Sequence, residues 1–190
     1  MLPFWTRRVG HFHICGMQPH PYPTLASLRR AMPWQSRPRS AGTPRAIAVH
    51  EAGHVVLMQW IGLQSPAASI VVDAAGARGE ACWPGREFFA RLPDPPQDES
   101  GVLSATGAAI YHAGVVAELL DAGIRATGPI FYPQATDYLR ADDLLLDRFG
   151  RHSSAAHFYA QQVARHVLSG RWREVEAIAQ RLTVSGTWAP

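Results

Sequence analysis

The sequence predicts a mainly helical domain of the α+β class that contains one small β-hairpin. Two observations lead to this prediction. Apolar residues at helical spacing, bounded by capping residues, prolines or glycines, recur in five segments after residue 43. Between the first two of these segments, two short strand-like runs flank a glycine-containing turn. The 190 residues suit one domain with a real hydrophobic core.

The first predicted helix covers residues 45–61. Thr43 is suited to cap its N-terminus, Pro44 fits its first turn, and Gly62 can end it. The stretch HEAGH, at residues 50–54, lies in the middle of this otherwise apolar helix.

The hairpin is expected from strands over residues 69–73 and 80–84, joined by the turn AAGARG. Pro84 places the second strand at the edge of the sheet, because proline cannot donate to a neighbouring strand. A loop over residues 85–100 should follow. The remaining helices are expected over residues 101–122, 135–149, 154–168 and 171–182. Small residues along the first of these four allow close packing against another helix.

Residues 1–43 are expected to form a disordered, basic, Pro/Arg-rich N-terminal segment with at most a short helix near residues 25–31, and residues 44–190 the folded domain. The segment contains no Asp or Glu. Because few aromatic residues stand between its arginines, we expect no specific binding of nucleic acid.

Composition excludes several classes of function. All 18 basic residues are arginines, so these residues cannot form a P-loop, which needs a lysine. No run of about 18 apolar residues exists, so no transmembrane segment is expected, and the first residues lack the apolar core of a secretory signal. The two cysteines, Cys15 and Cys82, are poorly placed for a structural disulfide. We therefore expect a cytoplasmic protein.

The HEAGH stretch predicts a zinc site. His50 and His54 are four residues apart, so on a helix both imidazoles leave the same face and can bind one Zn²⁺. Glu51 lies at the edge of that face, where it can take a proton from water and pass it to a leaving amine. The competing interpretation is a polar helix face with two hydrated histidines, which explains poorly why they interrupt an apolar helix.

A catalytic zinc site needs a third protein ligand and one open position. Position 60 is Trp60, so the third histidine of a metzincin is absent. The residues alone leave five candidates open, which are Glu118, Asp137, Asp142, Asp143 and, further away, His112.

The chain resembles the protease domain of the FtsH-type, membrane-anchored AAA+ zinc proteases over residues 44–188. The resemblance rests on five stretches in the family's order: AVHEAGHVVL, SIVVDAAGARGEACWP, AIYHAGVVAELL, ATG followed by TDYLRADDLL, and VLSGRWREVEAIAQRL. It implies that Asp137, four positions before Ala141, is the third ligand. It also implies that Glu118 supports the site from behind the ligands or has a structural role.

The chain also departs from this family. Eight residues separate Gly128 from Asp137, more than in the family, so the segment IFYPQ looks inserted. Val115 stands where the family has arginine, and Leu119 replaces a glutamate. The 190 residues include neither the ATPase domain nor the membrane anchor, so we expect activity that is independent of ATP.

These observations together predict a zincin-like helical zinc metallopeptidase that cleaves unstructured or flexible polypeptides. The substrate is expected to bind as an added strand along the second predicted strand, at Gly79, Glu80, Ala81, Cys82 and Trp83. Two alternatives stay open: a catalytically silent binding or regulatory module that keeps zinc for stability, and a zinc amidase that acts on small molecules. A separate ATPase partner and oligomerisation also stay open.

Overall fold

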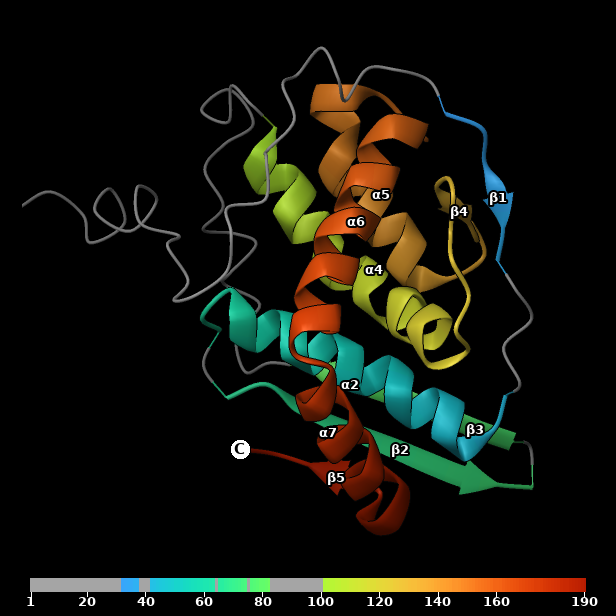
Figure 1. Ribbon diagram of the computed structural model, residues 1–190, viewed down its shortest axis with the longest axis vertical. Coiled ribbons are helices and arrows are strands. Elements are labelled where there is room, and N and C mark those ends of the chain that lie inside the picture. The colour runs from blue at the N-terminus through green and yellow to red at the C-terminus, as the bar shows by residue number, and fades with distance from the viewer. Residues whose placement is uncertain (1–31, 38–41, 64, 75, 83–100) are drawn as a thin grey trace, which may run out of the picture.

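The computed structural model describes residues 32–37, 42–63, 65–74, 76–82 and 101–190, except the side chains of residues 102 and 103. In this part of the chain there are five helices, a small antiparallel sheet that lies at one side of the helices, and a separate strand pair (Figure 1). The prediction of a mainly helical domain with a small sheet is therefore confirmed. The expected short helix at residues 25–31 and the expected loop at residues 85–100 lie outside the described residues.

Helix α2 (Pro44–Trp60) is the central element. The Thr43 hydroxyl accepts a hydrogen bond from the Ala46 amide at 3.2 Å, and Pro44 occupies the first turn, as its missing N–H allows. The chain leaves the helix through Gly62, whose φ is +82°. The helix packs against α4 (Val102–Asp121), α7 (Trp172–Ser185) and the sheet, so most side chains from Ala48 to Met58 are buried.

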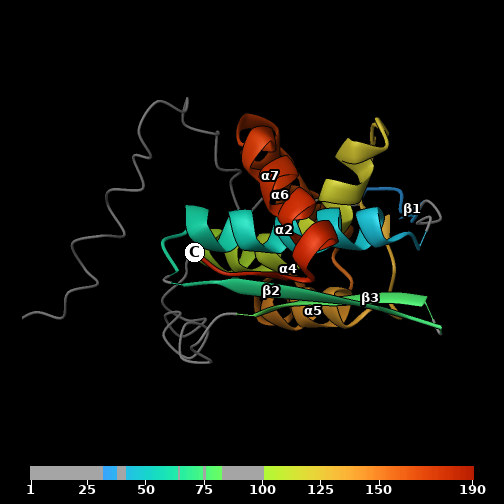
Figure 2. The same cartoon turned by 90° about the horizontal axis from the view of Figure 1, so that it is seen from below.

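The sheet lies along one side of α2 and has the strand order β3-β2-β5 (Figure 2). The hairpin strands are β2 (Ala67–Asp73) and β3 (Gly76–Cys82), and both begin earlier than the sequence predicts. The turn is short because Gly76 adopts a φ of +124°, and Asp73 pairs with it. Strand β5 (Thr187–Trp188) is a short addition that the sequence analysis did not predict.

The C-terminal helices agree with the prediction to within three residues. Helix α5 is Thr136–Phe149 and α6 is Ser154–Gly170, while α7 continues to Ser185 and ends at Gly186 with a φ of +73°. The small residues of α4 are used as expected. A Cβ on Gly53 of α2 would lie 2.7 Å from the Ala113 carbonyl oxygen, so glycine is required for the two helices to approach.

Residues 32–37 differ from the expectation of disorder up to residue 43. Strand β1 (Gln35–Ser36) pairs in parallel with β4 (Ile130–Phe131), which belongs to the segment that looks inserted. The Trp34 ring lies 5.0 Å from the Phe131 ring and 5.4 Å from the His157 ring, measured between centroids. An aromatic anchor and a short strand partner, neither of which has a local sequence signal, therefore hold this segment in place. The rest of residues 1–43, apart from residues 42 and 43, is not described.

None of the described helices is long and apolar enough to cross a membrane.

Candidate metal centre

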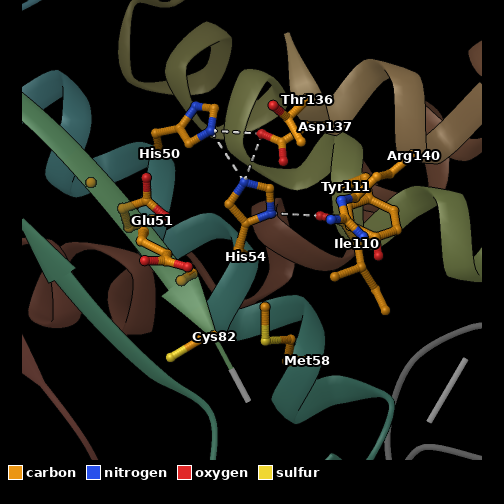
Figure 3. Close-up of a pocket in the computed structure, with 13 residues that line it drawn as sticks. His50, Glu51, His54, Met58, Cys82, Ile110, Tyr111, Thr136, Asp137 and Arg140 are labelled. Carbon is orange, nitrogen blue, oxygen red and sulfur yellow. Dashed lines mark hydrogen bonds and ion pairs between the residues drawn. The ribbon is translucent and has the colours of Figure 1, made fainter. Parts of the chain in front are cut away.

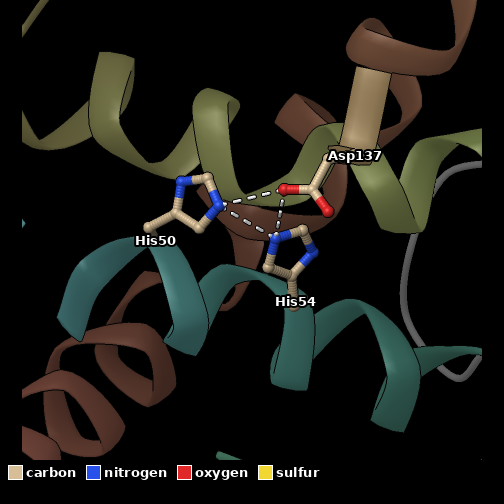
Figure 4. A group of neighbouring side chains, drawn as sticks. All are labelled: His50, His54 and Asp137. Atoms are coloured by element: carbon tan, nitrogen blue, oxygen red, sulfur yellow. Dashed lines mark hydrogen bonds and ion pairs between the residues drawn. The ribbon is translucent and has the colours of Figure 1, made fainter. Parts of the chain in front are cut away.

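Three side chains from two helices converge on one point (Figure 4). The Nε2 atoms of His50 and His54 are 3.1 Å apart, and the Asp137 Oδ2 lies 3.2 Å from the first and 3.4 Å from the second. The histidines are one turn apart on α2, and Asp137 lies in the first turn of α5. In the described part of the chain, this is the only group of His, Cys, Asp and Glu side chains with the geometry of a metal site.

The protonation of both imidazoles is fixed by the atoms behind them. Glu118 Oε1 lies 2.6 Å from the Nδ1 of His50, and the Ile110 carbonyl oxygen lies 2.7 Å from the Nδ1 of His54. Since these oxygens only accept, each Nδ1 carries a hydrogen and donates it. Each Nε2 is then the ring atom available to a metal ion, once it gives up the hydrogen that it shares with Asp137, and this is the arrangement of metal-binding histidines.

The separations fit a tetrahedral zinc ion. Bonds of about 2.0–2.1 Å place the ligand atoms of such an ion about 3.3–3.4 Å apart. The three measured separations lie between 3.1 and 3.4 Å. His50, His54 and Asp137 could therefore hold a metal ion, and two imidazoles with one carboxylate leave a fourth position open.

The electrostatics of the group favour a positive charge at its centre. Burial lowers the pKa of His50, but hydrogen bonds to Asp137 and Glu118 outweigh it and raise the pKa to about 9. Burial likewise raises the pKa of Asp137, but hydrogen bonds from the two imidazoles hold it well below its usual range. The carboxylate is thus ionised, as a metal ligand must be.

The other candidates for the third ligand lie elsewhere. Glu118 contacts the opposite edge of the His50 ring and also accepts from Arg37 at 2.5 Å. Burial raises the pKa of Glu118, but His50 and Arg37 outweigh it, so the pKa is lowered. Asp142 and His112 belong to a separate buried network, and Asp143 is exposed on α5.

Glu51 lies in the same cleft, on the β3 side of the two imidazoles (Figure 3). Its side chain is buried, with 6% of the residue exposed. Burial raises the pKa of Glu51, and His54 and His50 only partly oppose this shift. A carboxylate with a raised proton affinity next to a metal site is suited to general-base chemistry.

The cleft has a volume of about 1120 Å³ and is bounded on one side by the last residues of β3. Gly79, Glu80, Ala81 and Cys82 all line it, while Trp83 lies outside the described residues. A Cβ at Gly79 would lie 2.6 Å from Cγ of Glu51, so glycine at this position makes room for the Glu51 side chain.

The backbone of β3 offers hydrogen-bonding groups to the cleft. Ile70 of β2 donates to the Gly186 carbonyl on the β5 side, so its backbone groups face away from β3. Ile70 is paired with Gly79 and Ala68 with Ala81, and both pairs are therefore of the type without mutual hydrogen bonds. It follows that the N–H and C=O groups of Gly79 and Ala81 point to the free edge, since β3 pairs only with β2 among the described strands.

Five residues of the cleft were not predicted from the sequence: Met58, Ile110, Tyr111, Thr136 and Arg140. Of these, Tyr111 of α4 and Arg140 of α5 lie on the side of the imidazoles away from β3 (Figure 3), and Arg140 is hydrogen-bonded to the Tyr111 side chain. Arg140 follows Asp137 by three residues, so helical spacing alone places both on one face. Tyr111 had no such signal, because only tertiary packing brings α4 to the cleft.

A buried chain of hydrogen bonds behind the site docks α5. The Tyr132 hydroxyl lies 2.7 Å from the Nδ1 of His112, whose Nε2 lies 2.9 Å from the Nδ1 of His157. The Nε2 of His157 lies 3.1 Å from Asp142, which can only accept. Burial lowers the pKa of both histidines, which favours their neutral forms. With both imidazoles neutral, the donors run in one direction, from Tyr132 to Asp142.

Comparisons of the chain with family models, with curated proteins and with solved structures found no match. The function is therefore inferred from the geometry of this cleft.

Proposed function

We propose that the protein is a zinc-dependent metallopeptidase that hydrolyses peptide bonds in unstructured or flexible polypeptides. The observation that carries this proposal is the convergence of His50, His54 and Asp137 with Glu51 in one open cleft. The donor set of two imidazoles and one carboxylate is typical of catalytic rather than structural zinc. A buried glutamate beside the ligands has no role in a site that serves only stability.

The residues divide the chemistry between them. His50, His54 and Asp137 would hold the zinc ion, which would supply Lewis-acid chemistry toward a carbonyl oxygen and a water molecule. The Glu51 carboxylate takes a proton from the attacking water and returns it to the nitrogen of the departing amine. Arg140 and Tyr111 line the cleft on the other side of the ligands, where a bound peptide segment would meet them.

The substrate strand is held by the free edge of β3. The outward N–H and C=O groups of Gly79 and Ala81 can pair with an extended peptide with little regard for its sequence. Such binding requires an extended segment. Opening one in a folded protein costs on the order of its stability, about 5–15 kcal/mol. With no lysine the 190 residues cannot form a P-loop, so the proposed activity is independent of ATP.

Membership of a zincin-like, FtsH-type peptidase family is part of this proposal. It is supported by the position of Asp137 beside the histidines and of Glu118 behind His50, where the resemblance expects them. A cytoplasmic location is also proposed, from the two cysteines that are poorly placed for a disulfide and from the lack of a long apolar run in the sequence.

The test combines metal analysis with proteolysis. The purified protein should contain one zinc per chain, and wild type should cleave casein while Glu51→Gln retains zinc and is inactive. A stable folded domain, offered as the substrate in place of casein, should stay uncleaved with or without ATP. Zinc without any hydrolysis would point to a binding or regulatory module, and hydrolysis of small amides alone would point to an amidase. ATP-stimulated digestion of the folded domain by the pure chain would refute the proposal.

A further inference from the structure

The N-terminal strap, defined here as residues 32–37, contacts Glu118, the residue that lies behind the proposed ligand His50. At its end, the Arg37 Nη2 donates to Glu118 Oε1 at 2.5 Å. The same oxygen accepts from the Nδ1 of His50 at 2.6 Å. Arg37, Glu118 and His50 therefore form a continuous chain from the strap to a ligand. The side chains of Arg37 and Glu118 are only 28% and 12% exposed, so water screens this contact weakly.

The strap is anchored independently of Arg37. The Gln35 amide donates to the Pro129 carbonyl at 2.8 Å, and the Met32 amide donates to the Ser154 hydroxyl at 2.8 Å. Gly128 permits this approach, because a Cβ there would lie 2.6 Å from the Pro33 carbonyl oxygen. Backbone contacts at the start and in the middle of the strap thus fix the place from which Arg37 extends.

The guanidinium of Arg37 is also held on its face. Its central carbon lies 5.5 Å from the centre of the Tyr132 ring, within the range of a cation–π contact. Tyr132 is itself buried and bound to His112. The planar guanidinium lies over the Tyr132 ring and donates from Nη2 to Glu118. A lysine could not hold its charge in this orientation, because its ammonium is not planar and its side chain is more flexible.

We propose that Arg37 is a positioning residue of the metal centre. It holds the Glu118 carboxylate in the one place from which that carboxylate can accept from the Nδ1 of His50. The bond keeps the hydrogen of His50 on Nδ1 and the Nε2 lone pair aimed at the metal position. This inference rests on the proposed metal site, and it makes the strap a part of that site although none of its residues is a ligand.

The experiment measures zinc affinity directly, by competition with a chromophoric chelator, in the full chain. Arg37→Ala should weaken zinc binding about 10- to 100-fold, the usual effect of losing support behind a ligand. Arg37→Lys should recover only part of this loss. Arg45→Ala is the matched control, because Arg45 also bonds a carboxylate of α4, Asp121, at 2.6 Å but lies away from the ligands. It should change affinity less than twofold.

A double-variant cycle separates positioning from a general loss of structure. In a Glu118→Ala background, Arg37→Ala should add little, because Arg37 acts through the Glu118 side chain. The d–d absorption of the cobalt-substituted protein should shift with Arg37→Ala and not with Arg45→Ala. Wild-type affinity in Arg37→Ala, or effects of Arg37 and Glu118 that add independently, would overturn this inference alone. A wild-type protein that bound no zinc would overturn the proposed function as well.

Discussion

Removal of the Asp137 carboxylate provides the sharpest test of the ligand assignment. In Asp137→Ala the two imidazoles remain on α2, but the oxygen that lies 3.2 and 3.4 Å from their Nε2 atoms is gone. Asp143→Ala is the matched control. It removes the same group from the same helix at an exposed position six residues further on (143 − 137).

The expected loss of affinity can be worked out from the number of ligands. A complete structural zinc site with four ligands is worth about 10–16 kcal/mol, or about 2.5–4 kcal/mol per ligand. Loss of Asp137 should therefore weaken zinc binding about 10²- to 10³-fold. At a free zinc concentration of 100 times the wild-type Kd, bound metal raises the free energy of unfolding by about 2.7 kcal/mol. The variant should gain about 0.4 kcal/mol or less.

The assay is thermal unfolding with and without zinc. For a domain of this size, about 1 kcal/mol corresponds to about 2–4 °C in Tm. Wild type and Asp143→Ala should both gain about 5–10 °C on adding zinc, and Asp137→Ala about 1 °C. If Asp137→Ala keeps the full gain while Glu118→Ala loses it, the ligand is Glu118 and the reasoning from the three separations is wrong.

Three further predictions follow from the cleft and the core. Ala81→Pro removes a donor that faces the free edge of β3, so it should raise KM for peptides about three- to tenfold with zinc still bound. The control is Glu80→Pro, which should instead destabilise the hairpin because the N–H of Glu80 faces β2. Equal KM values for Ala81→Pro and wild type would exclude edge binding. Arg140→Ala should lower kcat/KM up to about fivefold for a peptide with an acidic residue near the cleaved bond, and a neutral peptide, the control, should be unaffected. Because burial lowers the pKa values of His112 and His157, their contribution to stability is complete above about pH 6.5 and is lost as pH falls toward their folded-state values, by up to about 1.4 kcal/mol per pH unit for each histidine. Urea unfolding between pH 7.5 and 5 measures this slope, and His157→Gln should make it shallower; an unchanged slope would show that His157 is already charged in the native state.

Local sequence signals were enough for the helices and for two of the candidate ligands. The spacing of His50 and His54 on a capped helix places both imidazoles on one face without knowledge of the fold. The choice among the acidic candidates required tertiary structure. Asp137 and Glu118 are both near His50, but on opposite edges of its ring, and only the docking of α4 and α5 decides which edge each one meets.

The remaining features depend on long-range pairing, for which the chain carries no local signal. Strands β1, β4 and β5 have two residues each and no alternating pattern. The basic composition of residues 1–43 predicted disorder, because charge and proline content dominate such an estimate. One tryptophan, Trp34, and the hydrogen bonds of the Met32 and Gln35 amides hold residues 32–37 in place.

The distance along the chain between the ligands has a consequence for folding. His54 and Asp137 are 83 residues apart (137 − 54), and the hairpin and α4 lie between them. Closing a flexible loop of that length costs about 4 kcal/mol in chain entropy, which offsets the about 2.5–4 kcal/mol that one ligand contributes. Packing of α2, α4 and α5 must therefore bring the ends together before an ion can bind both. Metal uptake would then be a late event in folding, and release of the ion would report the separation of α5 from α2 while the individual helices are still intact.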